Sequence, residues 1–178
     1  MADQQAPGQK TAQAAPQLTK QQIETALGRL RTQQNLAGGI GAGVVASLVG
    51  AAIWAAVTVA TGYQIGWMAI GVGFLVGMAV RTVGKGIDNI FGIAGAVLAL
   101  LGCAVGNLLA VVGFVSQQES APFMSILSQL DFATIEELMV QTFSPMDLLF
   151  YGIAIYEGYK LSFRQVTEQA VKAALAGR

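Results

Sequence analysis

The 178-residue chain contains no histidine, one cysteine and few charged residues, which form only 11% of the sequence. The missing histidines exclude imidazole metal ligands and histidine general bases, and the lone Cys103 excludes disulfide frameworks and cysteine-based zinc sites. Soluble domains carry about 25% charged residues. Because 54% of this chain is hydrophobic, it has too little polar material to cover a water-soluble globule, and we expect a membrane protein.

Two long runs of the sequence, 32–80 and 89–118, contain no Asp, Glu, Lys or Arg. A helix that crosses the roughly 30 Å hydrocarbon core of a bilayer needs about 20 apolar residues. The first run is therefore long enough for two spans joined by a turn at 61–64, and the second run is long enough for one. The predicted spans are residues 36–60, 65–83 and 90–115.

A fourth apolar segment, 146–163, is interrupted by Asp147, Glu157 and Lys160, so hydropathy alone does not decide whether it crosses. Basic residues concentrate on the cytoplasmic side of short loops. If this segment crosses, all ten Lys and Arg residues lie on one side, and the segment 116–143, which has acidic but no basic residues, lies on the other. We therefore predict four spans in the cytoplasmic (inner) membrane, with both termini cytoplasmic.

Small residues recur at steps of three and four within the first three predicted spans. In lipid, no hydrophobic effect separates helices from lipid tails, so flat faces of small residues supply much of the attraction between helices. The predicted fold is an all-α, integral membrane four-helix bundle with Gly/Ala packing faces and short amphipathic helices outside the membrane. The small residues are Gly39, Gly43, Ala46 and Gly50 in the first span, Gly66, Ala69, Gly73 and Gly77 in the second, and Gly95, Ala99, Gly102, Gly106, Ala110 and Gly113 in the third.

The two terminal segments lie outside the predicted spans. Residues 1–18 are rich in Gln, Ala and Pro, lack the apolar run of a signal peptide, and are predicted to form a disordered tail. Thr19 and Gln22 have the spacing of a capping box, which predicts a cytoplasmic amphipathic helix within 19–35 that rests on the membrane surface or on a partner. Residues 164–178 are predicted to form a cytoplasmic tail.

The segment between the third and fourth spans is predicted to form two short outer helices within 122–142. Thr134 and Glu137 have the spacing of a capping box that starts the second of these helices. Ser144 and Asp147 give the same signal at the start of the fourth span. Capping therefore explains why an acidic residue, Asp147, lies at this end of a span.

Three polar residues within the predicted spans are candidates for function: Asn107 in the third span, and Glu157 and Lys160 in the fourth. An ionisable group inside a span is costly and is a functional hypothesis by default. As structural alternatives, Asn107 forms a hydrogen bond between helices worth about 1 kcal/mol or less, and Glu157 pairs with Lys160 near the inner interface. Cys103 is expected to be an inert packing residue.

Two basic residues, Arg81 and Lys85, lie in the predicted inner loop between the second and third spans. The sequence around Lys85 has glycines on both sides, but it lacks the Ser or Thr and the preceding strand of a phosphate-binding loop, so we do not predict nucleotide binding. Arg81 and Lys85 are candidates for contact with an anionic lipid headgroup. As an alternative, they act only as determinants of membrane orientation.

Segments 80–86 (VRTVGKG), 102–109 (GCAVGNLL) and 144–160 (SPMDLLFYGIAIYEGYK) resemble parts of small bacterial four-span, multi-pass membrane proteins. The resemblance covers about the last two thirds of the chain. It implies a location in a bacterial inner membrane. It implies no activity, cofactor or functional residue.

The sequence favours a non-enzymatic role in helix association, as a scaffold or as an accessory subunit. We expect the lipid bilayer and a second copy or another membrane protein as partners, and we expect no nucleic acid, cofactor, metal or catalytic residue. The alternative is a small pore or an ion or proton transporter that uses Asn107 and Glu157. An enzyme is the least favoured class, because no group of residues suited to catalysis is expected to meet at one site.

Overall fold

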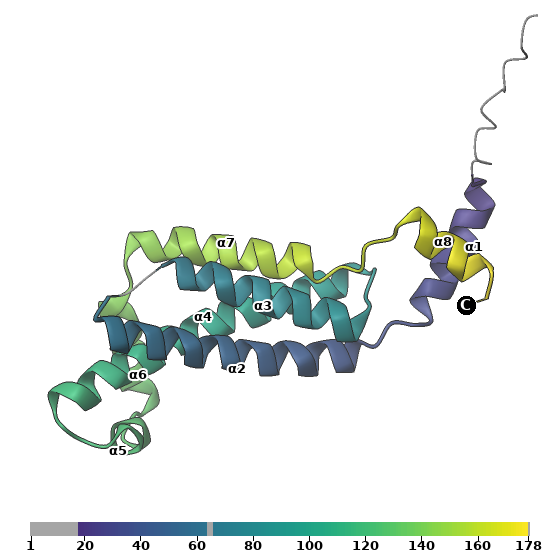
Figure 1. Ribbon diagram of the computed structural model, residues 1–178. Coiled ribbons are helices and arrows are strands. Elements are labelled where there is room, and N and C mark those ends of the chain that lie inside the picture. The colour runs from purple at the N-terminus through teal and green to yellow at the C-terminus, as the bar shows by residue number, and fades with distance from the viewer. Residues whose placement is uncertain (1–17, 64–65, 178) are drawn as a thin grey trace, which may run out of the picture.

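The computed structural model describes residues 18–63 and 66–177, and this part of the chain is all-α, with eight helices (Figure 1). The predicted disordered tail lies outside the described residues except for Leu18, as does part of the predicted turn at 61–64. The helices are α1 (Lys20–Arg31), α2 (Leu36–Thr61), α3 (Trp67–Gly84), α4 (Asn89–Gln118), α5 (Phe123–Ser128), α6 (Phe132–Thr142), α7 (Pro145–Leu161) and α8 (Glu168–Leu175).

Three helices, α2, α3 and α4, are long and apolar enough to cross a membrane. A fourth crossing is added if α6 and α7, which meet at 103°, are counted together as one bent span. The predicted spans agree closely with the helices. The clearest differences are that α4 continues to Gln118 and that α7 ends at Leu161.

Helix α7 packs along α3 and α4 in the bundle (Figure 1). A Cβ atom added to Gly158 of α7 would lie 2.7 Å from the carbonyl oxygen of Gly95 in α4. A Cβ atom added to Gly77 of α3 would lie 2.7 Å from the Cβ atom of Leu161 in α7. The backbones therefore approach so closely that larger residues at these positions would push α7 away from the other two helices.

The interior of the bundle is filled by apolar side chains from all four long helices, and the largest fully buried one is Trp54. Large apolar side chains also cover the outside. Val45, for example, is 62% exposed and Leu101 is 52% exposed. An apolar outside is what a hydrocarbon solvent requires, and in water it would favour aggregation.

Helices α2 and α4 are longer than α3 and α7, the other two helices of the bundle. The rings of Trp67, at the start of α3, and Phe150, near the start of α7, are 5.9 Å apart, so these two helices begin at a similar level. Asn107 of α4 contacts Thr142, just before α7, and therefore lies at this same level. The part of α4 from Asn89 to Asn107 is about 27 Å long, and the rest adds about 16 Å. We call the part of the bundle in which α2, α3, α4 and α7 lie side by side the four-helix section. Its length along α4, from Asn89 to Asn107, is about the thickness of a hydrocarbon core.

The two ends of the bundle carry opposite charge. We call the end at α1 and α8 the basic end, and the end at α5 and α6 the acidic end (Figure 1). The described basic residues all lie at the basic end and are Lys20, Arg29, Arg31, Arg81, Lys85, Lys160, Arg164 and Lys172. The acidic residues at the acidic end are Glu119, Asp131, Glu136, Glu137 and Asp147.

Helices α1 and α8 form a small two-helix unit at the basic end. Ala26 and Leu30 of α1 are buried against Val171 and Ala174 of α8. The sequence predicted that the apolar face of the first helix rests on the membrane or on a partner. In the structure, α8 covers part of this face, since Leu30 is buried, whereas Ile23 is 38% exposed.

Arg29 connects α1 to the end of α8. Its Nη1 atom donates hydrogen bonds to the carbonyl oxygens of Ala174 and Leu175, at 2.8 and 3.0 Å. The last carbonyls of a helix have no partner within the helix and carry partial negative charge, so a cation there is favourable. Within α8, Glu168 and Lys172 form an ion pair with an N–O distance of 2.6 Å.

Two of the three predicted helix starts are confirmed. Thr19 with Gln22 and Ser144 with Asp147 both form complete capping boxes. The start predicted at Thr134 is wrong, because α6 begins three residues earlier. The Asp131 side chain is the cap and accepts a hydrogen bond from the backbone N–H of Thr134 at 2.8 Å. Asp is among the best N-cap residues.

Candidate functional site

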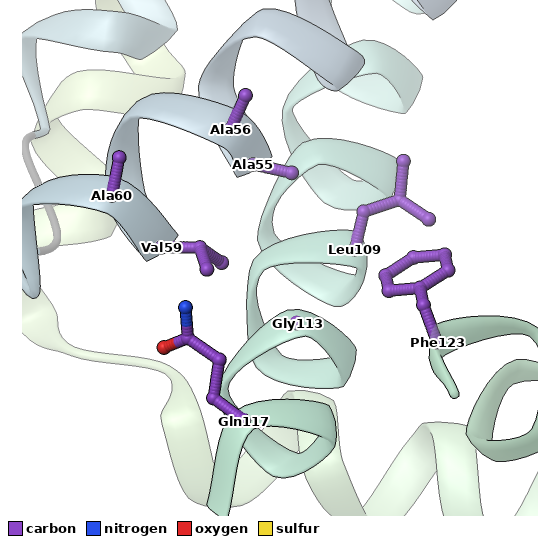
Figure 2. Close-up of a pocket in the computed structure, with 8 residues that line it drawn as sticks. All are labelled: Ala55, Ala56, Val59, Ala60, Leu109, Gly113, Gln117 and Phe123. Carbon is purple, nitrogen blue, oxygen red and sulfur yellow. The ribbon is translucent and has the colours of Figure 1, made fainter. Parts of the chain in front are cut away.

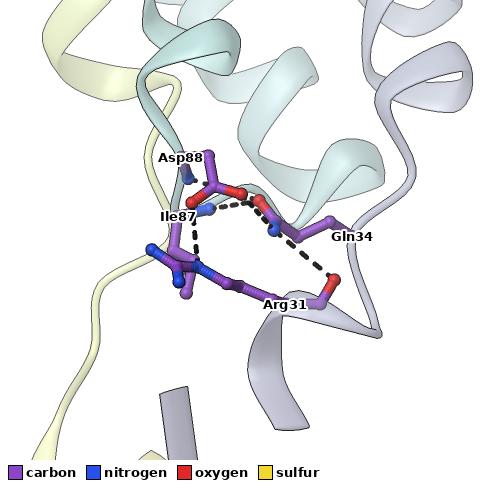
Figure 3. Close-up of polar contacts among 4 residues, drawn as sticks. All are labelled: Arg31, Gln34, Ile87 and Asp88. Atoms are coloured by element: carbon purple, nitrogen blue, oxygen red, sulfur yellow. Dashed lines mark hydrogen bonds and ion pairs between the residues drawn. The ribbon is translucent and has the colours of Figure 1, made fainter. Parts of the chain in front are cut away.

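Gln34 is the centre of a polar junction at the basic end (Figure 3). Its Nε2 atom donates to Asp88 Oδ2 at 2.8 Å, and its Oε1 atom accepts from the backbone N–H groups of Ile87 and Asp88 at 2.9 and 3.2 Å. Arg31 Nε lies 3.0 Å from Asp88 Oδ1. One amide side chain thus connects the α1–α2 link to the α3–α4 loop.

The chain segment that links α7 to α8 also takes part in this junction. The backbone N–H of Arg164 donates to the carbonyl oxygen of Gly86 at 2.7 Å, and Arg164 Nη1 donates to Gln33 Oε1 at 3.0 Å. The backbone N–H of Asn35 donates to the carbonyl oxygen of Gly84 at 2.9 Å. Three loops far apart in sequence are therefore held together by hydrogen bonds.

The charge of Asp88 is stabilised at this junction. The hydrogen bond from the Gln34 side chain, followed by the nearby guanidinium of Arg31, holds the pKa of the Asp88 carboxyl below its ordinary value. Asp88 therefore remains ionised at neutral pH and keeps both contacts. The sequence analysis missed this junction, since no local pattern connects residues that lie 54 positions apart.

Arg81 and Lys85, the predicted headgroup residues, lie beside this junction. Arg81 is in the last turn of α3, and Lys85 is the residue that ends the helix, with a left-handed backbone conformation (φ 50°). The backbone N–H of Lys85 donates to the carbonyl oxygen of Arg81 at 3.0 Å. The Lys85 side chain is exposed. Both cations thus lie one helical turn apart at the end of a bundle helix, and their contact with an anionic headgroup stays a prediction.

Asn107 joins α4 to α6. It is 3% exposed, and its Nδ2 atom donates to Thr142 Oγ1 at 3.3 Å. The thioether Sδ atom of Met139 lies 4.0 Å from the same nitrogen. These contacts are those of a polar link between helices, which was the structural alternative for this residue.

Glu157 and Lys160 do not form the ion pair that was the structural alternative for them. Lys160 Nζ lies instead 5.2 Å from the centre of the Tyr156 ring, which is a cation–π distance. Glu157 is half-buried near the basic end of α7. Its neighbour Gly158 packs on Gly95, which is about 18 Å along α4 from Asn107. The structure therefore places the two candidate transport residues at opposite ends of the four-helix section.

Cys103 is fully buried in α4, with its Sγ atom 3.9 Å from the carbonyl oxygen of Ala69. Its surroundings are the apolar core that also contains Trp54 and Tyr151. This position is that of a packing residue.

A groove of about 320 Å³ lies between α2 and α4 at the acidic end (Figure 2). In Figure 2 the Phe123 ring, from α5, lies next to Leu109, and the Gln117 side chain extends toward Val59. Most of the remaining lining side chains are small. The lining residues are Ala55, Ala56, Val59, Ala60, Leu109, Gly113, Gln117 and Phe123.

Comparison of the chain with protein-family models, curated proteins and solved structures finds no match. The resemblance to small bacterial membrane proteins therefore rests on the three sequence segments alone, and the site is interpreted from its own chemistry.

Proposed function

We propose that this protein is a four-span membrane protein of the cytoplasmic membrane with a non-enzymatic role in helix association, as a scaffold or accessory subunit. The basic end faces the cytoplasm in this proposal, since basic residues concentrate on that side. The pairing of α1 with α8 supports four spans. These two helices flank the bundle in the sequence, so their contact requires that the chain enters and leaves the bundle on the same side of the membrane.

The contacts inside the bundle support a role based on packing. Small residues at helix contacts let backbones approach, which drives association in lipid, and the close approach of Gly95 and Gly158 supports this role. Two of the buried polar side chains, Ser47 and Asn107, also bond to other helices. Ser47 Oγ, for example, donates to the carbonyl oxygen of Leu98 at 2.8 Å.

The groove in Figure 2 is the observation that carries the association role. Ala56 and Ala60 are exposed there, and small exposed residues allow another helix to approach closely. We propose that a helix of a second copy or of another membrane protein occupies this groove. The transport alternative has less support, because Asn107 and Glu157 lie at opposite ends of the bundle and do not form one site.

Cysteine crosslinking in native membranes tests this role. In a Cys103→Ser background, Ala56→Cys places a thiol in the groove, and Ala52→Cys places one on the exposed surface of the same helix, one turn away. A thiol crosslinker should join Ala56→Cys, and not Ala52→Cys, to a partner. Equal crosslinking of both variants, or of neither, would contradict the proposal.

A flux measurement separates association from transport. Glu157→Gln and Asn107→Ala, each reconstituted into liposomes, should show the same ion and proton flux as the unmodified protein. Loss of flux in either variant would favour the transport alternative.

A further inference from the structure

A second and larger groove lies where α6 meets the flank of the bundle. Its volume is about 570 Å³, which is within the roughly 300–1,000 Å³ of small-molecule sites. Residues of α4, α6 and α7 line it, together with Phe143, which follows the last residue of α6. The lining residues are Leu100, Leu101, Ala104, Glu136, Met139, Val140, Phe143 and Tyr151.

The direction of α6 determines what can enter this groove. Helix α7 runs along the bundle, and α6 meets it at 103°, so α6 lies across the bundle axis. If the bundle spans a membrane, α6 lies near the membrane surface at the acidic end. Leu100, Leu101 and Ala104 belong to the part of α4 that has the thickness of the hydrocarbon core. The groove beneath α6 therefore opens toward lipid tails.

The surface of α6 favours contact with hydrocarbon. Val140 is 72% exposed and Phe132 is 81% exposed. The aromatic rings at the back of the groove form a fixed wall, since the rings of Phe143 and Trp54 each lie 6.3 Å from the ring of Tyr151 in edge-to-face contact. An acyl chain entering from the membrane would meet apolar atoms of α4, α6 and α7.

The charge at the groove favours one type of headgroup. The charged residue of the lining is Glu136. It lies one turn from Met139 and Val140, on the side of α6 that lines the groove. The segment 116–143 has no Lys or Arg. An ammonium group would pair with the Glu136 carboxylate, whereas a headgroup of net negative charge would be repelled.

We propose that this groove binds one acyl chain of a phospholipid with an amine headgroup, from the leaflet at the acidic end, and that Glu136 contacts its ammonium group. This inference rests on the proposed embedding of the bundle in a membrane, but not on the association role. Loss of lipid binding with intact crosslinking at Ala56→Cys would overturn the lipid site alone.

Lipid retention tests the site. The full chain is reconstituted in vesicles of equal phosphatidylethanolamine and phosphatidylglycerol, extracted in mild detergent, and its retained lipid is identified by mass spectrometry. The unmodified protein should retain about one phosphatidylethanolamine per chain, in the ratio set by the proposed single site. Ala104→Phe, which fills the groove, should lose it, and Ala52→Phe, on the exposed surface of α2, should keep it.

Two further variants test the headgroup contact. Glu136→Gln should remove the preference for phosphatidylethanolamine over phosphatidylglycerol, and Glu119→Gln, an acidic residue outside the groove, should leave it unchanged. A preference that survives in Glu136→Gln would overturn the role of this carboxylate.

The fold of Ala104→Phe is checked independently of lipid retention. Its thermal unfolding in detergent should occur near that of the unmodified protein, and added phosphatidylethanolamine should raise the unfolding temperature of the unmodified protein more than that of the variant. Retention of lipid by Ala104→Phe, absence of retained lipid in the unmodified protein, or crosslinking of Val140→Cys to a second copy in the Cys103→Ser background would each overturn the proposal.

Discussion

The two ends of the bundle are held in different ways. At the basic end, Gln34, Asp88 and Arg164 connect three loops through hydrogen bonds, and a two-helix unit has its own small core. At the acidic end, α5 and α6 expose large apolar side chains such as Phe132 and Met124. The basic end is therefore organised by contacts within the chain, whereas the acidic end depends on hydrocarbon or a partner to cover its apolar surface.

Two glycines of α7 provide the largest test of this comparison. Gly158, toward the basic end, faces α4 and has no space for a Cβ atom, whereas Gly152, near the middle of α7, is exposed and has nothing within 4 Å of that position. Gly158→Ala should lower the free energy of unfolding by about 1–3 kcal/mol through overpacking. Gly152→Ala should leave it unchanged or raise it by up to about 1 kcal/mol, because alanine favours helix.

Reversible unfolding in mixed micelles measures both glycine variants. Equal effects at the two positions would mean that Gly158 is not closely packed against α4, and the description of the basic end as held by contacts within the chain would fail for this helix.

Replacement of Gln34 tests the junction at the basic end. Gln34→Ala leaves the backbone N–H groups of Ile87 and Asp88 without their acceptor, and such a loss costs about 1–2 kcal/mol. Hydrogen exchange should become faster at these two amides and remain unchanged in α6. Gln21→Ala, an exposed glutamine of α1, is the control and should change stability by less than about 0.5 kcal/mol. Unchanged protection of Ile87 in Gln34→Ala would show that the junction is held by other contacts.

The smallest expected effect is the pH dependence of Asp88. Its pKa is lower in the folded protein than its ordinary value of 3.8. The stabilising contribution is therefore complete above about pH 3.8 and is lost as the pH falls through the lower folded pKa. The difference in unfolding free energy between the unmodified protein and Asp88→Asn should stay constant from pH 7 to about pH 4 and shrink below it. A difference that already shrinks between pH 7 and pH 5 would contradict the lowered pKa.

Patterns within a few residues predicted most of the fold. The capping box at Ser144 and Asp147 marked the start of α7 because both partners lie within one turn. The charge-free runs marked α2, α3 and α4, since hydrocarbon excludes charges along the whole length of a span. The start of α6 was misplaced because Thr134 and Glu137 have the spacing of a capping box, although Asp131, which caps the helix, is the more favoured N-cap residue.

Contacts between distant residues could not be predicted in this way. Arg29 and Ala174 are 145 residues apart, and each has an ordinary local role as an exposed cation and a helical alanine. The Glu157–Lys160 pair illustrates the opposite problem. The spacing allowed an ion pair, but Lys160 lies over the Tyr156 ring, which is equally close on the helix surface.

The contact between Arg29 and the end of α8 has a consequence for synthesis of the protein. Helix α1 leaves the ribosome before α8, so Leu30 has no cover from α8 until the intervening segments have been translated. During that interval, α1 presents an apolar stripe that chaperones or the insertion machinery can recognise. Closure of α8 on α1 then buries Ala26 and Leu30, and a chain that stalls before α8 remains distinguishable from one that contains it.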